Sequence, residues 1–232
     1  MSGLLLDLGR QDYGRTWALQ RALVMQREQD NVPDLLLLVE HDHVITVGRR
    51  GAELPSNLPL PVYWVERGGM ATYHGPGQLV GYPILKLTQR GLSVKGYLRL
   101  LEQALIRSVA SLGIEAYRIE GHTGVWVAGR KVASIGVAVR NWVTYHGFAL
   151  NVNADLSYFR LISPCGLDPS VMTTLQGELG RPLTVAEVKP PVIKSLQEEL
   201  DMEFRPTSLD TLLSAGEHGP LAKAFYQGRG SG

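Results

Sequence analysis

The feature that most restricts the fold of this chain is a glycine-rich run at residues 67–82, RGGMATYHGPGQLVGY. Five glycines and a proline stand there among arginine, threonine, histidine, glutamine and two tyrosines. Glycine adds no buried side-chain area and loses much backbone entropy on folding, so it suits places where the backbone turns sharply or lies close to another group. Two interpretations remain open: a long, tight connection between strands, or a wall of a binding site.

The glycine spacing within this run is close to a dinucleotide-binding fingerprint, because Gly75, Gly77 and Gly81 form G-x-G-x-x-x-G. That fingerprint must open a helix whose N-terminus holds the pyrophosphate. Here Pro83 and an apolar run follow, and the segment is typical of a strand. A G-x-x-x-x-G-K-[ST] loop is absent from the sequence as well. We therefore predict neither a Rossmann site nor a P-loop.

Composition excludes several other classes of protein. A formal net charge of +1 over 232 residues argues against nucleic-acid binding through a broad basic face. The single cysteine excludes an intrachain disulfide and a zinc site built from several thiolates. No run approaches the roughly 18 apolar residues of a membrane span, and residues 1–9 have no basic region ahead of their apolar run. We expect a cytoplasmic protein that binds neither nucleic acid nor membrane.

The first third of the chain alternates between strand and helix patterns. Residues 4–8 are a short apolar run, and Asp12 is placed to cap a helix that continues through Gln29. Residues 34–40 are typical of a strand buried on both faces, and residues 44–47 of another. Three prolines mark residues 55–61 as a loop, and a strand composition returns at 62–66.

Beyond the glycine-rich run, residues 79–87 are typical of a strand, and Ser93 is placed to cap a helix to about Leu112. Residues 124–153 predict antiparallel strands with turns at 128–129 and 140–141. Thr184 and Glu187 form a capping-box pattern, and we expect the adjacent prolines at 190–191 to break or kink the helix that it opens. Without regular βαβ alternation, the pattern predicts a single α+β domain with a mixed, largely antiparallel sheet flanked by helices.

Cys165 is the most reactive side chain that the sequence offers. Free cysteines are usually small buried hydrophobic groups, but its Pro and Gly neighbours fit a tight, accessible turn. Lowering a thiol pKa by two units takes roughly 2.7 kcal/mol. One ammonium about 4 Å away supplies approximately 4 kcal/mol at an effective dielectric of 20. A single lysine is enough, but sequence position does not say which one, and Lys131, at a predicted hairpin turn, is by default a solvated surface charge.

Two histidine patterns are weaker signals. His41 and His43 flank Asp42, but no nearby third histidine or cysteine completes a usual zinc set, so a polar turn is the preferred interpretation. His74 lies inside the glycine-rich run, although a lone histidine is more often a hydrogen-bonded structural group than a catalytic one. We predict no metal site and no cofactor.

Several separate motifs, in this order, resemble the lipoyl(octanoyl) transferases, the octanoyl-[acyl carrier protein]:protein N-octanoyltransferases. The run at 67–82 carries most of the resemblance. It continues in GVWV at 124–127, RKVASIG at 130–136, HGFALNVN at 146–153 and PCG at 164–166. Shorter similarities lie between residues 40 and 51, so the resemblance covers roughly residues 4–200. It implies an octanoyltransferase catalytic domain at residues 1–204 and an extension at 205–232 without a recognised domain.

The resemblance implies the fold of the biotin and lipoate protein ligase catalytic domains. It also implies a reaction in which an octanoyl group passes from octanoyl-acyl carrier protein to an enzyme cysteine as a thioester. The group is then transferred to a lysine of lipoyl domains, those of 2-oxoacid dehydrogenase E2 subunits and the glycine cleavage H protein.

Family matching assigns Cys165 as the nucleophile and Lys131 as the group that lowers its pKa and moves protons. The substrate-binding residues implied in the same way are Arg67, Gly68, Gly69, Met70, Ala71, Thr72, Tyr73, His74, Ser134, Ile135, Gly136, Gly147, Phe148 and Ala149.

Two other functions remain as alternatives. An ATP-dependent lipoate or biotin ligase of the same fold needs groups for the phosphates and needs no cysteine, whereas a non-catalytic module binds carrier or lipoyl domains without chemistry. The PCG motif and the HGPGQ segment at 74–78 favour the transferase.

Overall fold

The computed structural model describes residues 2–162 and 166–214. Eight strands form one large sheet in the order β11-β1-β2-β6-β10-β9-β8-β7. Their bounds are β1 Ser2–Gln11, β2 Leu35–His41, β6 Gln78–Ile84, β7 Tyr117–Ile119, β8 His122–Val127, β9 Arg130–Arg140, β10 Val143–Asn151 and β11 Glu203–Thr207. The pairs β11-β1 and β1-β2 are parallel and the other five are antiparallel. The predicted α+β class with a mixed, largely antiparallel sheet is confirmed.

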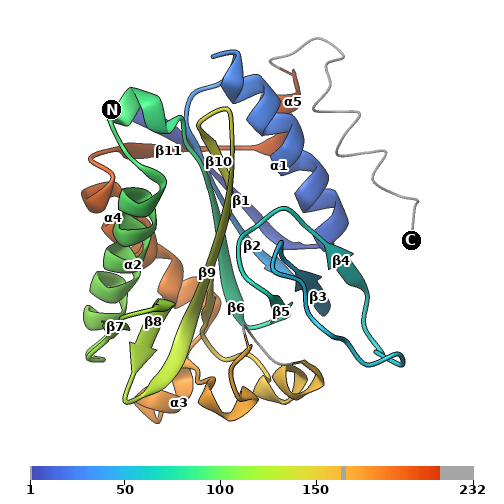
Figure 1. Ribbon diagram of the computed structural model, residues 1–232. Coiled ribbons are helices and arrows are strands. Elements are labelled where there is room, and N and C mark those ends of the chain that lie inside the picture. The colour runs from blue at the N-terminus through green and yellow to red at the C-terminus, as the bar shows by residue number, and fades with distance from the viewer. Residues whose placement is uncertain (1, 163–165, 215–232) are drawn as a thin grey trace.

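Helices cover both faces of the large sheet (Figure 1). Helix α1 (Tyr13–Glu28) lies on one face, and α2 (Val94–Ala110) and α4 (Val185–Glu199) lie together on the other. Strand β2 shows why both faces need cover: Leu36 and Leu38 belong to the apolar cluster under α2 and α4, whereas Leu35, Leu37 and Val39 belong to the cluster under α1. The predicted two-sided burial of this strand is confirmed.

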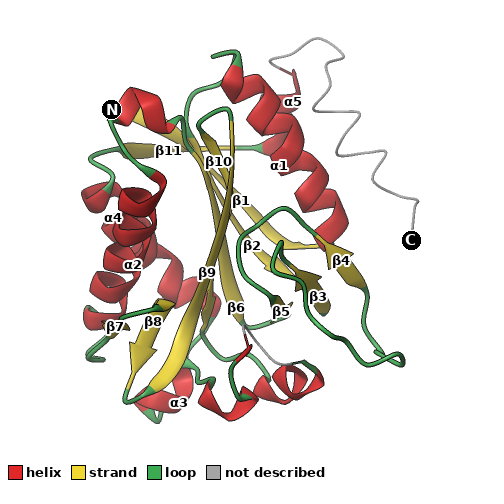
Figure 2. Cartoon of the chain, viewed as in Figure 1, coloured by secondary structure: helices red, strands yellow, loops and turns green. Residues whose placement is uncertain are grey.

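A second, three-stranded sheet in the order β4-β3-β5 lies toward the start of α1 (Figure 2). Its strands are β3 (Val44–Val47), β4 (Val62–Trp64) and β5 (Ala71–His74). The first two match predicted strands. The third lies inside the glycine-rich run and was not predicted, because glycines on both sides hide a four-residue strand whose pairing with β3 is a tertiary event.

The predicted helix caps are all present. Asp12 accepts from the Arg15 backbone N–H and Ser93 from that of Gly96, each through its side chain. Thr184 and Glu187 form the reciprocal capping box. These interactions satisfy backbone N–H groups that have no partner within the helix. The starts of these three helices therefore follow local sequence signals closely.

Helix α4 corrects one prediction, because it runs without interruption through Pro190 and Pro191. The expected break is therefore wrong, and the alternative, a kink, stays a prediction. Val188 and Val192, on either side of the two prolines, are both buried in the core shared with α2. Burial of both halves against the same surface offsets the loss of backbone hydrogen bonds at proline, which costs about 3 kcal/mol in an ordinary helix.

The remaining described elements are short. They are α3 (Leu175–Leu179), α5 (Leu209–Ser214) and the 3-10 segments Leu87–Arg90, Leu156–Leu161 and Pro169–Val171. Strand β11 spans position 204 and pairs with β1. The division into a catalytic domain at 1–204 and an extension at 205–232 stays a prediction. Within residues 2–162 and 166–214, none of the helices has the length and apolar character to cross a bilayer.

Candidate active site

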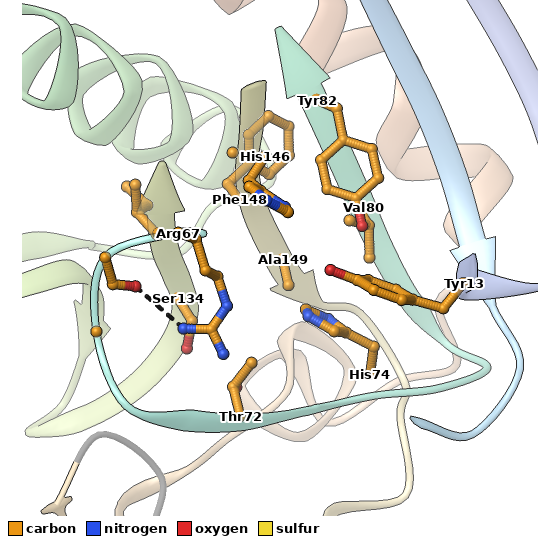
Figure 3. Close-up of a pocket in the computed structure, with 15 residues that line it drawn as sticks. Tyr13, Arg67, Thr72, His74, Val80, Tyr82, Ser134, His146, Phe148 and Ala149 are labelled. Carbon is orange, nitrogen blue, oxygen red and sulfur yellow. Dashed lines mark hydrogen bonds between the residues drawn. The ribbon is translucent and has the colours of Figure 1, made fainter. Parts of the chain in front are cut away.

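An inner cavity lies where β5 and the start of α1 meet the middle strands of the large sheet (Figure 3). It is narrow, with about 40 Å³ open to the centres of water molecules. The lining residues are Tyr13, Arg67, Gly68, Gly69, Thr72, His74, Val80, Tyr82, Ser134, Ile135, Gly136, His146, Gly147, Phe148 and Ala149. A slot of this size with mostly apolar walls suits a slender, unbranched chain.

Glycines on adjacent strands of the large sheet shape the floor of the inner cavity. Gly147 on β10 pairs with Gly136 on β9, and Phe148 pairs with Gly81 on β6. A Cβ at Gly147 would lie 2.1 Å from the Gly81 carbonyl oxygen, so no larger residue fits without moving the backbone. A Cβ at Gly81 would lie 2.2 Å from the ring of Phe148, which occupies that space instead.

Arg67 is held in one place at the rim between the two sheets. Its Nη2 donates to the Thr46 carbonyl at 2.7 Å and to Thr46 Oγ1 at 2.9 Å, and its Nη1 donates to the Gly68 carbonyl at 3.1 Å. The side chain is buried, with 6% of its surface exposed. A guanidinium never loses its charge in proteins, so Arg67 places a permanent positive charge beside the cavity.

Two buried histidines lie on the opposite side of the cavity: His74 lines it, and His41 lies behind His74 and Tyr82. The His41 ring donates from Nδ1 to the Gln11 carbonyl at 3.1 Å and accepts from the Tyr82 hydroxyl at 2.8 Å, which fixes its tautomer. Burial lowers the pKa of His41 to about 4. Burial, with His41 and the Arg67 charge nearby, also holds the pKa of His74 well below its ordinary value. The Tyr13 ring stacks on His74 (Figure 3), and their ring centroids are 6.0 Å apart.

His146 completes this wall from β10. Its Nε2 lies 3.4 Å from Glu66 Oε2, which also accepts from the Trp17 indole at 3.0 Å. The hydrogen bond from His146 lowers the pKa of Glu66 to about 2. Burial lowers the pKa of His146 itself, and Glu66 opposes that effect. The His146 backbone has a φ of 54°, a left-handed conformation that is costly outside glycine, and its N–H donates to the Gln20 side chain at 2.8 Å.

Lys131 lies at a second hollow, the outer groove, and its side chain is buried with only 4% of the residue exposed. The groove is lined by Arg50, Gly68, Gly69, Met70, Val94, Leu98, Gly121, His122, Thr123, Lys131, Ile135, Gly136, Val137 and Leu167, and its volume is about 460 Å³. It shares Gly68, Gly69, Ile135 and Gly136 with the inner cavity, so the two hollows are neighbours. The default expectation of a solvated surface lysine is wrong for Lys131.

The fold of β9 explains why Lys131 is buried. It pairs with Trp126 across the β8-β9 hairpin, and its Nζ lies 5.5 Å from the centre of the indole ring. Its carbonyl accepts from the Thr173 backbone N–H at 3.0 Å. The hairpin turn was predicted, but the pairing of Lys131 with Met172, which is distant in sequence, was not.

Cys165 lies outside the described residues, so its assignment as the nucleophile stays a prediction. The chain that follows it is described. Leu167 lines the outer groove together with Lys131, and a Cβ on Gly166 would lie 3.3 Å from the sulfur of Met70.

The structure brings together eleven of the fourteen residues implied as substrate-binding in the inner cavity: Arg67, Gly68, Gly69, Thr72, His74, Ser134, Ile135, Gly136, Gly147, Phe148 and Ala149. Met70 lines the outer groove instead. Ala71 and Tyr73 belong to an apolar cluster with Phe159. They alternate with Thr72 and His74 along β5, and successive side chains of a strand point to opposite faces. Whether any of the fourteen binds substrate stays a prediction.

Four lining residues were missed by sequence reasoning: Tyr13, Val80, Tyr82 and His146. Val80 and Tyr82 had a usable signal, since period-2 alternation along β6 puts both on one face. Tyr13 had none, because only the packing of α1 against the small sheet brings it to the cavity. His146 was noted only as part of a motif.

No group of three or more His, Cys, Asp or Glu residues in the described chain is arranged to hold a metal ion. His41 and His43 have separate partners, since His43 lies 2.8 Å from the Tyr73 hydroxyl while His41 bonds to Tyr82.

Sequence comparisons identify relatives over most of the chain. Residues 12–197 match the lipoyl protein ligase A/B catalytic domain family. An octanoyltransferase of Geobacter sulfurreducens is 50% identical over 187 residues, covering 80% of this chain and 79% of that protein. An octanoyltransferase of Acidothermus cellulolyticus is 49% identical over 202 residues, covering 84% and 90%.

Solved structures give the same fold at low identity. A lipoate-protein ligase A crystallised with ATP superposes with a TM-score of 0.80 at 17% identity, over 100% of this chain and 97% of that one. A biotin protein ligase of Aquifex aeolicus superposes with a TM-score of 0.51 at 15% identity, over 87% and 70%. The family match and the sequence relatives show that the chain belongs to the lipoyl protein ligase A/B catalytic domain family and, within it, to the octanoyltransferases.

Proposed function

We propose that this octanoyltransferase takes its acyl group from octanoyl-acyl carrier protein and passes it, through a thioester on Cys165, to a lysine of a lipoyl domain. The acceptors in this proposal are the lipoyl domains of 2-oxoacid dehydrogenase E2 subunits and the glycine cleavage H protein. The observation that carries it is the burial of Lys131 in a groove that Leu167, two residues after Cys165, also lines.

The inner cavity supports the choice of an acyl chain. Its walls combine the apolar side chains of Val80, Ile135, Phe148 and Ala149 with glycine backbone, and its narrow volume fits a linear chain. Burying methylenes contributes about 0.8 kcal/mol each, so an eight-carbon chain supplies several kcal/mol of binding. Because the cavity adjoins the outer groove at Gly68, Gly69 and Gly136, a chain in the cavity leaves its thioester end near the groove.

In the first step, the Cys165 thiolate attacks the carbonyl carbon of the donor thioester. The new carbon–sulfur bond forms, the bond to the carrier thiol breaks, and the Lys131 ammonium gives its proton to that leaving thiolate. In the second step, a neutral lysine amine attacks the acyl-enzyme. The carbon–nitrogen bond forms, the bond to Cys165 breaks, and Lys131 takes the proton that the amine loses. The thiolate and the ammonium are then restored.

The decisive test is intact-mass spectrometry after incubation with octanoyl-carrier protein and no ATP. We expect a mass increase of one octanoyl group on the wild-type protein and none on Cys165→Ser. A strict requirement for ATP would favour a ligase, and partner binding without an adduct would favour a non-catalytic module. Either result contradicts the proposal. Cys165→Ala, compared by circular dichroism, controls for misfolding.

A further inference from the structure

The outer groove combines apolar walls with an exposed arginine, and the proposed function gives no role to either. Its walls are apolar at Val94, Leu98 and Val137, and Arg50 lies at its rim with an exposed side chain. No aspartate or glutamate is among its described lining residues. Within the described chain, no carboxylate forms an ion pair with Arg50. A groove of this kind attracts an elongated, partly apolar ligand that ends in an anion.

Two substrates must reach the same point of the enzyme, and they differ in charge. The donor arm of a carrier protein is phosphopantetheine, an extended chain of methylenes and amides that ends in a phosphodiester anion. The acceptor is a lysine side chain, which is a cation in water. Arg50 and Lys131 both line the groove. Their positive charges attract the anionic arm and repel the cationic lysine.

Arg50 is anchored beside the path that such an arm takes along the groove. Its backbone N–H donates to the Gly69 carbonyl at 3.1 Å, so the residue is anchored to the floor that the groove shares with the inner cavity. The thioester lies at Lys131 in the proposed function, and the arm extends from there along the groove. An arginine is also the side chain best suited to a phosphate, because its planar fork donates two parallel hydrogen bonds.

We propose that the outer groove binds the phosphopantetheine arm of the acyl donor, with Arg50 as the residue that recognises its phosphodiester. This inference rests on the proposed function, because it assumes a thioester donor that reaches Lys131. It adds Arg50 as a specificity-determining residue, which favours the anionic donor over the cationic acceptor.

Two small donors test the inference directly: S-octanoyl-4′-phosphopantetheine and S-octanoyl-pantetheine, which differ only in the phosphate. The readout is the ratio of their KM values for acylation of Cys165. We expect the phosphorylated donor to have a KM about three- to tenfold lower in the wild-type enzyme, the range typical of a partly exposed charged hydrogen bond. In Arg50→Gln the ratio falls to about one.

Arg49→Gln is the matched control. It removes the same charge from the adjacent exposed residue, which does not line the groove, so the ratio of KM values keeps its wild-type size. Equal KM values for both donors in the wild-type enzyme overturn the inference, and so does a ratio that survives Arg50→Gln.

Octanoyl-carrier protein, assayed in parallel, separates this inference from the proposed function. Acylation by the carrier but by neither small donor overturns the inference, since the arm itself is then not recognised. Failure of all three donors refutes the proposed function as well.

Discussion

The side chain of Lys131 lies directly against the backbone of Gly124 on the neighbouring strand. A Cβ at position 124 would stand 2.6 Å from Lys131 Cε and 3.3 Å from its Nζ. Gly124 has a φ of 134°, and its N–H donates to the buried carboxylate of Glu102 at 3.1 Å. The absence of a side chain at 124 therefore sets the course of the Lys131 side chain into the outer groove.

Gly124→Ala is expected to displace the Lys131 ammonium and lower the rate of acyl-enzyme formation by at least about tenfold, since proton transfer by a positioned group contributes about 10²–10⁴. In our proposal the same change raises the thiol pKa of Cys165. The pH profile of iodoacetamide alkylation measures that shift. Gly129→Ala is the control, because Gly129 also has a positive φ of 78° but has no atom within 4 Å of an added Cβ. Identical alkylation profiles for the two variants would contradict the role of Gly124.

Asp34 holds two buried arginines between α1 and the start of α2. It accepts from Arg27 Nε at 2.7 Å and from Arg90 Nε at 2.9 Å, and all three side chains are at most 6% exposed. Asp34→Ala leaves two buried positive charges without this partner, and we expect a loss of about 3–5 kcal/mol in the free energy of unfolding.

Urea denaturation at pH 7 measures the effect of Asp34→Ala. Asp7→Ala is the control, because the ion pair of Asp7 with Lys189 is partly exposed and such pairs contribute about 0–1 kcal/mol. A similar loss of unfolding free energy in both variants would show that burial of the ion pair does not determine the effect of removing it.

Three buried histidines, His41, His74 and His146, predict acid sensitivity. The pKa of His41 is lowered from 6.5 to about 4, so between these values the unfolded chain binds a proton that the folded chain does not. Stability therefore rises with pH across this window, is fully present above pH 6.5, and falls as pH decreases toward 4. His74 and His146 act in the same direction, because burial lowers their pKa values too.

Each such proton contributes up to about 1.4 kcal/mol per pH unit. Urea midpoints between pH 7 and 5 measure how the free energy of unfolding changes with pH. His41→Gln is expected to reduce this slope by the contribution of up to one bound proton. His122→Gln, at an exposed position, leaves the slope unchanged. Stability that does not vary between pH 7 and 5 would contradict the neutral state of these histidines.

Gly147 is expected to tolerate a larger residue only with a loss of stability. In Gly147→Ala the added Cβ meets the Gly81 carbonyl oxygen at 2.1 Å, and backbone cannot rotate away as a side chain can. We expect a loss of about 1–3 kcal/mol, the usual cost of overpacking, with a lower rate of octanoyl transfer because the cavity floor moves. Gly96→Ala is the control, because Gly96 lies within α2 and an added Cβ comes no closer than 3.2 Å, to the Ser93 hydroxyl. Wild-type stability in Gly147→Ala would show that β6 and β10 are not held together this closely.

Local signals in the chain were enough to locate most elements of the fold. Asp12, Ser93 and Thr184 each begin a helix where their side chains bond the exposed backbone N–H groups of the first turn. The four consecutive leucines of β2 predicted a strand covered on both faces, and the structure shows it. Such signals act over three or four residues, or through strand periodicity, and depend little on distant parts of the chain.

Other features followed only from the tertiary structure. Tyr13 reaches the inner cavity because α1 packs against the small sheet, and β5 exists only through its pairing with β3. Lys131, in a hairpin that sequence places at the surface, is buried, and its backbone pairs with residues 172–173, distant in sequence. The glycine-rich run is both a connection and a cavity wall, since its arginine, threonine and histidine face the cavity between two sheets. The physical reason is common to all of these: burial of a side chain depends on which distant segment packs over it, and local sequence carries no record of that partner.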